Sequence, residues 1–195
     1  MSADRALKRC SWANPNNPRY LRYHDEEWGV ACHDDQKLYE MLLLESFQAG
    51  LSWEIILNKR EAFRAAFDGF DFDAVCAYDA EKIDALMQNP AIVRNRRKLE
   101  SAVTNSRVFR GIRSEFGSFD AFLRGFTDGE VLVETDPAVT TNALSDRVSA
   151  ELKRRGMKFV GSTIIYSYLQ AVGVIFSHSP ECFCYQRLAA LDHFS

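Results

Sequence analysis

Two pairs of soft metal ligands stand near opposite ends of the sequence. His178 and Cys182 lie on either side of Pro180, a residue that interrupts regular helix. Cys10 and His24 add two further ligands, and four such side chains make a closed tetrahedral zinc site. A site of this kind would hold one structural ion and join the first segment of the chain to the last. The alternative is that these histidines and thiols are inert parts of the core.

A lone acid interrupts the apolar stretch MLLLESFQAGLSW. Glu45 is the only charged residue between Glu40 and Glu54, and helical spacing places it on the same face as the preceding apolar residues. A buried charge is costly without a partner, so the carboxylate needs either a structural salt bridge or helix-cap contact, or a ligand that is cationic or donates hydrogen bonds. Trp53, just after the Gly-Leu-Ser turn, would form a stacking wall for such a ligand.

Aromatic residues gather in the segment that contains the first histidine. Tyr20 and Tyr23 are one helical turn apart if this segment is helical, and Trp12 and Trp28 flank them. These rings either extend the pocket predicted at Glu45 or belong to the plain core.

The charge distribution suggests local contacts with a polyanion, at residues 94–113 and at a later basic cluster of Lys153, Arg154, Arg155 and Lys158. The net charge is −3, yet residues 94–113 contain seven basic residues and one acid. The stretch MQNPAIVRNRRKL is typical of two helices joined by a short turn, a helix-hairpin-helix that offers backbone amides to a DNA phosphate. Ala91 stands where a glycine would let the backbone approach closely. The alternative is a solvated helix face.

Helices are predicted over nearly the whole chain, from capping residues and apolar spacing. The predicted ranges are 34–49, ended by Gly50, a helix begun by Ser52, 79–88, a helix begun by Asn95, 145–156 begun by Ser145, and 162–177. Residues 125–142 are predicted to be a long loop with a short strand.

Length and composition indicate one globular domain over residues 1–195, with 47% hydrophobic residues. The first residues lack an apolar signal segment, and the uncharged stretch 159–180 is interrupted by polar side chains, so we expect an intracellular protein with a buried helix there and no membrane contact. Five cysteines argue against a disulfide framework. Cys32, Cys76 and Cys184 are expected to be buried fillers.

The motifs together resemble the bacterial DNA-3-methyladenine glycosylase I family of the helix-hairpin-helix superfamily. The similarity runs from Cys10-Ser-Trp12 through YHDEEWGV, LLLESFQAGLSWEIIL, NPAIVRNRRKL and LKRRGMKFVGSTIIYSYLQAVG to HSPECFCY. The resemblance implies an all-α helix-hairpin-helix glycosylase fold in one compact unit, with zinc-tethered termini at about 10–28 and 178–185. It also implies a monomeric bacterial protein of the cytoplasm, associated with the nucleoid. Two departures are a longer Cys10–His24 spacing and Ala91 in place of a hairpin glycine.

The activity implied is excision of 3-methyladenine from alkylated double-stranded DNA, without lyase chemistry, to release free 3-methyladenine. The expected roles are Glu45 as the catalytic residue; Trp53, Tyr20, Tyr23 and Trp12 in base binding; Leu51, Ile92, Arg94, Arg96 and Arg97 in DNA contact; and Cys10, His24, His178 and Cys182 as zinc ligands. Asp120 lacks a convincing match to the catalytic aspartate of related enzymes and receives no role. The alternatives are a non-catalytic zinc-containing DNA-binding module and a small-molecule-binding domain.

Overall fold

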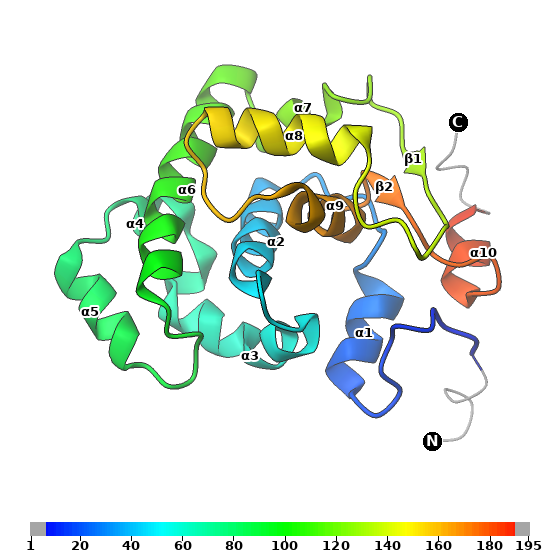
Figure 1. Cartoon of the computed structure of the whole chain (residues 1–195), viewed down its shortest axis with the longest axis horizontal. Coiled ribbons are helices and arrows are strands. Elements are labelled where there is room, and N and C mark those ends of the chain that lie inside the picture. The colour runs from blue at the N-terminus through cyan, green and yellow to red at the C-terminus, as the bar shows by residue number, and fades with distance from the viewer. Residues whose placement is uncertain (1–6, 190–195) are drawn as a thin grey trace.

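The computed structural model describes residues 7–189 and is mostly helical, with one small sheet (Figure 1). In chain order the elements are α1 (Pro18–Glu26), α2 (Asp35–Gln48), α3 (Trp53–Ala66), the 3₁₀ turn η2 (Asp68–Phe70), α4 (Phe72–Cys76), α5 (Ala80–Gln88), α6 (Arg96–Phe116), α7 (Phe119–Arg124), β1 (Leu132–Val133), α8 (Ala143–Arg154), α9 (Ser162–Ala171), β2 (Ile175–Phe176) and α10 (Phe183–Ala189). The predicted unit 1–195 and the expected absence of a signal segment extend to residues outside the described range.

Helix α2 forms the centre of the molecule (Figure 1). Every residue from Leu38 to Phe47 is buried, and the helix packs against α3, α6, α7 and α9. A helix that is covered on all sides must carry apolar residues on all sides, which explains the run of leucines in its sequence. Glu40 and Glu45 are therefore both placed inside the protein.

Four of the predicted helix starts are confirmed. The side chains of Asp34, Ser52, Asp79 and Asn95 each accept a hydrogen bond from a backbone N–H in the first turn of the following helix. These bonds satisfy amides that have no partner within the helix. The helical spacing of the two tyrosines is also confirmed, since both lie in α1. The short helices α4 and α7 were not predicted.

Two predicted boundaries are wrong. Helix α8 begins after Asn142, and Ser145 is the third residue of the helix, where the two side chains form a capping box. Helix α9 ends at Ala171 rather than near residue 177, because Gly173 turns the chain with a φ of +71°. A Cβ there would lie 2.5 Å from the backbone nitrogen of Ala31, so only glycine fits.

The chain beyond this turn forms β2, which pairs in parallel with the earlier strand β1: Leu132 pairs with Ile175 and Val133 with Phe176. The strand predicted within 125–142 is thus present, and the all-α expectation needs this small correction. Strand β2 leads directly to the predicted ligand His178. The first described segment, α1, the sheet and α10 lie together at one end of the molecule (Figure 1).

Residues 7–189 contain no helix that is both long enough and apolar enough to cross a membrane.

Candidate functional site

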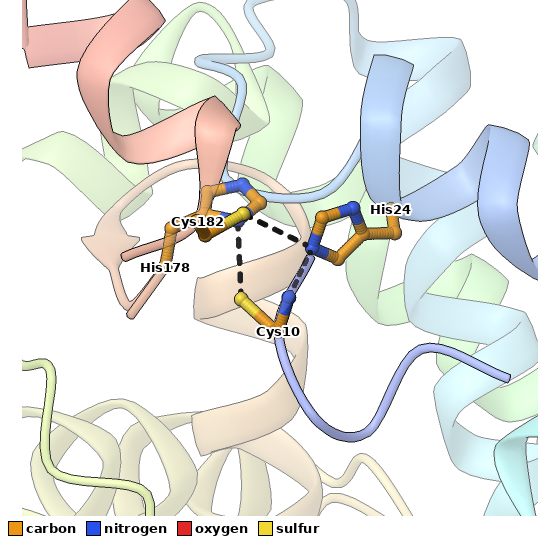
Figure 2. Close-up of side chains that lie close together, drawn as sticks. All are labelled: Cys10, His24, His178 and Cys182. Atoms are coloured by element: carbon orange, nitrogen blue, oxygen red, sulfur yellow. Dashed lines mark hydrogen bonds between the residues drawn. The ribbon is translucent and has the colours of Figure 1, made fainter. Parts of the chain in front are cut away.

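The four predicted metal ligands come together in one buried cluster (Figure 2). The Sγ atom of Cys182 lies 3.5 Å from Nε2 of His24 and 3.6 Å from Nδ1 of His178. The Sγ atom of Cys10 lies 3.5 Å from the same nitrogen of His178. Tetrahedral zinc, ~2.3 Å from sulfur and ~2.0 Å from nitrogen, separates such atoms by about 3.5 Å. The donor set and its spacing therefore fit a zinc ion.

The surroundings of both histidines present a lone pair to the centre of this cluster. Nδ1 of His24 donates to Asp25 Oδ1 over 2.8 Å, which leaves Nε2 unprotonated. Asp25 is held in turn by Arg9, at 2.8 and 2.7 Å. Nε2 of His178 donates to the carbonyl of Trp28 over 3.0 Å, which leaves Nδ1 as the ligand. Such outer hydrogen bonds orient metal ligands and fix their tautomers.

Burial favours the neutral form of both rings. Desolvation lowers the pKa of His24 and lowers that of His178 to about 4. Neutral imidazole is the form that coordinates zinc. The remaining cysteines differ among themselves: Cys184 and Cys76 are buried, as predicted, whereas Cys32 is only half-buried.

A cavity of about 610 Å³ adjoins the cluster, and aromatic rings form much of its wall. Trp12 packs edge-on against Tyr20 at 5.6 Å and against Trp28 at 4.7 Å between ring centres. Tyr23 and Trp53 pack against each other at 5.4 Å. The predicted base-binding residues are thus brought together. Cys10 lines the same cavity, so the cluster and the cavity share a wall.

Glu45 also lines this cavity, and the fold gives its carboxyl no counter-charge. The side chain is buried, its Oε2 has no hydrogen-bond partner, and within residues 7–189 no ion pair involves it. Desolvation alone raises its pKa to about 8. The Nε1 atom of Trp53 is likewise buried without a partner. Two unpaired polar atoms in one cavity indicate a ligand that supplies the missing partners.

Glu40, on the same helix, is a buried acid with a structural role. It is as deeply buried as Glu45, but its Oε1 accepts hydrogen bonds of 2.7 Å from both Arg60 and Arg64 of α3. The salt-bridge alternative that the sequence left open for Glu45 is therefore true of its neighbour one and a half turns away.

The α2–α3 turn presents Leu51 beside the cavity. Gly50 has a φ of +79°, the Leu51 N–H donates to the carbonyl of Gln48 over 2.7 Å, and the Gln48 side-chain amide donates back to the carbonyl of Leu51 over 2.7 Å. Leu51 is half-buried. Ser52 then caps α3, whose first residue is Trp53. One tight turn thus connects the buried acid to the stacking tryptophan.

The predicted hairpin between α5 and α6 is present, with differences in detail. Ala91 does not have a positive φ, so the strain expected from replacing a glycine does not arise. Ile92 is 3% exposed, so its side chain is not available for the predicted contact with DNA. Arg94, Arg96 and Arg97 are all exposed, and Arg96 pairs with Asp84. Asp120, given no role, pairs with His33 and Arg124 and does not line the cavity.

A second turn that joins two helices, between α8 and α9, has the glycine and the open helix start that were expected at the α5–α6 turn. Gly156 adopts a φ of +103°, and α9 begins at Ser162 after Gly161, which provides no side-chain cap, so its first amides are open to an anion. Lys158 between them is exposed. Two glycines around a lysine in RGMKFVGS are the sequence signal for this turn, which was not predicted.

Comparison with known proteins gives consistent matches. The family model described as methyladenine glycosylase matches residues 12–185. DNA-3-methyladenine glycosylase 1 of Escherichia coli (strain K12) is 39% identical over 183 residues, which is 92% of this chain and 97% of that protein. A crystal structure of 3-methyladenine DNA glycosylase I superposes with a TM-score of 0.87 at 41% identity, covering 91% of this chain and 99% of the other. A variant of 3-methyladenine DNA glycosylase I in complex with 3-methyladenine superposes with a TM-score of 0.83 at 35% identity, covering 86% and 92%.

Proposed function

This chain belongs to the methyladenine glycosylase family, and from that premise we propose that it excises 3-methyladenine from alkylated double-stranded DNA by hydrolysing the N-glycosidic bond. The observation that carries the proposal is the buried, unpaired carboxyl of Glu45 in an aromatic-walled cavity. A purine methylated at N3 is cationic within DNA. It is therefore a ligand that matches both the acid and the rings around it.

Recognition begins with extrusion of the damaged base. A methylated base pairs poorly, so flipping it out of the helix costs less than flipping a normal base. Leu51, beside the cavity rather than within it, fills the gap left in the base stack. The extruded purine enters the cavity, where Trp53 stacks on it and Tyr20, Tyr23 and Trp12 complete the wall.

Glu45 then meets a positive charge. In the empty cavity at neutral pH the carboxyl is mostly protonated, since burial raises its pKa to about 8. An adjacent cation stabilises the carboxylate, which accepts hydrogen bonds from the polar edge of the base. A neutral adenine lacks this charge, so the pocket discriminates in favour of the lesion.

Hydrolysis breaks the bond between the sugar and the purine. The bond's electron pair moves to the cationic purine, which leaves as neutral 3-methyladenine, while water adds to the sugar carbon and loses a proton to solvent. Most of the rate enhancement comes from holding a labile substrate in a shaped, desolvated pocket. Lys98, in the first turn of α6, has its amine bonded to two backbone carbonyls, so we expect no Schiff base with the sugar and no strand cleavage.

Zinc has a structural role in this proposal. Cys10, His24, His178 and Cys182 would hold one ion, which would fasten the first segment of the chain to the last and take no part in the chemistry. Trp12 follows closely after Cys10 and contacts His24, with 5.1 Å between ring centres. The four ligands, held by an ion, would thereby fix Trp12 in one wall of the base pocket.

DNA contact involves both turns that join helices, α5–α6 and α8–α9. Arg94 and Arg97 at the α5–α6 turn, and Lys158 with the open amides of α9, face phosphates on either side of the extruded base. Arg96 contributes less, because Asp84 already neutralises it. The protein acts as one monomeric unit on DNA in the bacterial cytoplasm.

The test is to incubate the protein with alkylated duplex DNA and identify the released bases by chromatography. Wild-type protein should release 3-methyladenine, and Glu45→Gln should release it roughly 10- to 100-fold more slowly. Binding without base release would favour a non-catalytic DNA-binding module. Binding of free purine without any DNA binding would favour a small-molecule domain.

A further inference from the structure

Lys98 is a buried lysine that the cavity does not use. It lies in the first turn of α6, is 5% exposed, and is not among the residues that line the cavity. Its Nζ donates to the carbonyl of Phe47 over 2.8 Å and to the carbonyl of Ala49 over 2.6 Å. The ring of Phe159 lies 5.8 Å from the same nitrogen. No carboxylate is among these contacts, although burying an ammonium group is costly.

These contacts make the lysine a cap for the carboxyl end of α2. The last carbonyls of a helix have no partner within it and carry the negative end of the helix dipole, so a cation there is stabilising. Because Lys98 belongs to α6, its hydrogen bonds also hold the end of α2 against the α5–α6 hairpin. The contact with Phe159, a residue with a φ of +55°, adds the α8–α9 turn to the same junction.

The segment held by Lys98 is the one that carries Leu51. Ala49 accepts the shorter of the two hydrogen bonds and stands immediately before Gly50 and Leu51. A second lysine ties the following helix to the same hairpin, since Lys59 of α3 donates to the carbonyl of Ala91 over 2.8 Å. The α2–α3 turn is thus fastened on both sides to the turn predicted to contact DNA.

We propose that Lys98 is a positioning residue for base extrusion, whose ammonium group holds residues 49–52 so that Leu51 enters the base stack while the two helical turns grip the strand. The inference rests on the proposed glycosylase function and assigns a role outside its base pocket. Lys98 touches neither the base nor the sugar, and acts through the turn.

With this role, loss of Lys98 should affect base extrusion and free-base binding unequally, whereas a general loss of structure would affect both. Recognition of a free base depends on the cavity, whereas extrusion from a duplex also depends on the turn and on its register with the DNA. Loss of the cap should therefore weaken extrusion much more than free-base binding. A lesion that is already unstacked, as in single-stranded DNA, should be least affected.

The central variant is Lys98→Met, which keeps a long side chain and removes the charge and both hydrogen bonds. The matched control is Lys82→Met, because Lys82 also lies near an aromatic ring, Tyr78 at 4.8 Å, but pairs with Asp68 away from the turn. Extrusion is followed by the fluorescence of a 2-aminopurine placed beside the lesion in duplex DNA. Three further measurements are made on each variant: binding of free 3-methyladenine, single-turnover excision from duplex and single-stranded DNA, and thermal unfolding.

Lys98→Met should lower the extrusion signal and duplex excision at least about tenfold, with free-base binding changed less than about threefold. The deficit should shrink on single-stranded DNA, and Lys98→Arg, which keeps the charge and donors, should recover most of the loss. Equal losses on all substrates, or no loss on duplex DNA, would overturn the role. If Lys98→Met does not fold, Lys98→Gln is judged by the same criteria. An inactive wild type would refute the glycosylase function, while the extrusion signal would still decide the role of Lys98.

Discussion

Glu45→Gln should have two opposite effects: it should stabilise the empty protein at alkaline pH and impair base excision. The wild-type carboxyl is buried without a partner, so its ionised form destabilises the folded state. Glutamine has nearly the same shape and cannot ionise. The substitution removes the destabilising charge and, with it, the charge that attracts a cationic base.

The magnitude follows from the pKa in the two states. Burial raises the pKa of Glu45 from the ordinary 4.5 to about 8. Between these values the folded protein keeps a proton that the unfolded chain releases, so stability falls as pH rises and the loss is complete above pH 8. Each pKa unit corresponds to about 1.4 kcal/mol, which places the full effect at about 3 to 5 kcal/mol. Wild type and variant should therefore agree within about 1 kcal/mol at pH 5 and differ by the full amount at pH 8.5.

The assay is urea unfolding of both proteins at pH 5, 7 and 8.5, without ligand. Glu40→Gln provides the control, because Glu40 is on the same helix, equally buried, and bonded to Arg60 and Arg64. That change weakens the pairing of two partly buried arginines and should destabilise by about 1 to 3 kcal/mol. If Glu45→Gln gained no stability at pH 8.5, the carboxyl would have to be solvated or paired, and the argument for a cation-seeking pocket would fail.

Two further predictions concern the metal and the DNA face. Metal analysis should find about one zinc per chain. Asp25→Asn should weaken zinc affinity about 10- to 100-fold, measured in competition with a chromophoric chelator, because the substitution loosens the ring of His24. A metal-free protein with full activity would contradict the structural role of zinc. Arg97→Glu should weaken DNA binding and flatten its salt dependence, whereas Arg96→Glu should do so less, because Asp84 already pairs with Arg96; equal effects of the two changes would place the DNA face elsewhere.

The helix starts could be predicted because a cap is a local interaction. Asp34, Ser52 and Asn95 each bond to an amide two or three residues further along the chain, so the sequence contains both partners. The ligands of the metal cluster could also be predicted, since few residue types bind zinc. The four ligands were predicted from their residue types, and the family resemblance implied the same set; the structure brings them together although the two pairs lie more than 150 residues apart in the chain.

Boundaries that depend on tertiary contact could not be predicted. Helix α9 ends where it does because Gly173 passes close to Val30 and Ala31, and no local pattern reveals that approach. The burial of Ile92 and the pairing of Arg96 with Asp84 are likewise set by how α5 and α6 pack. Both residues were predicted to contact DNA, and their place in the chain does not reveal the burial of one or the acidic partner of the other.

Glu40 and Glu45 show where this limit affects function. The sequence drew attention to Glu45 because apolar residues surround it, yet Glu40 is buried to the same degree on the same helix. Only the fold distinguishes them, since α3 supplies two arginines to one and none to the other. A protein selected for stability alone would neutralise both acids or replace the second with glutamine. An acid that is left unpaired between tryptophan and tyrosine rings is therefore best explained by a positively charged ligand that is present only during function.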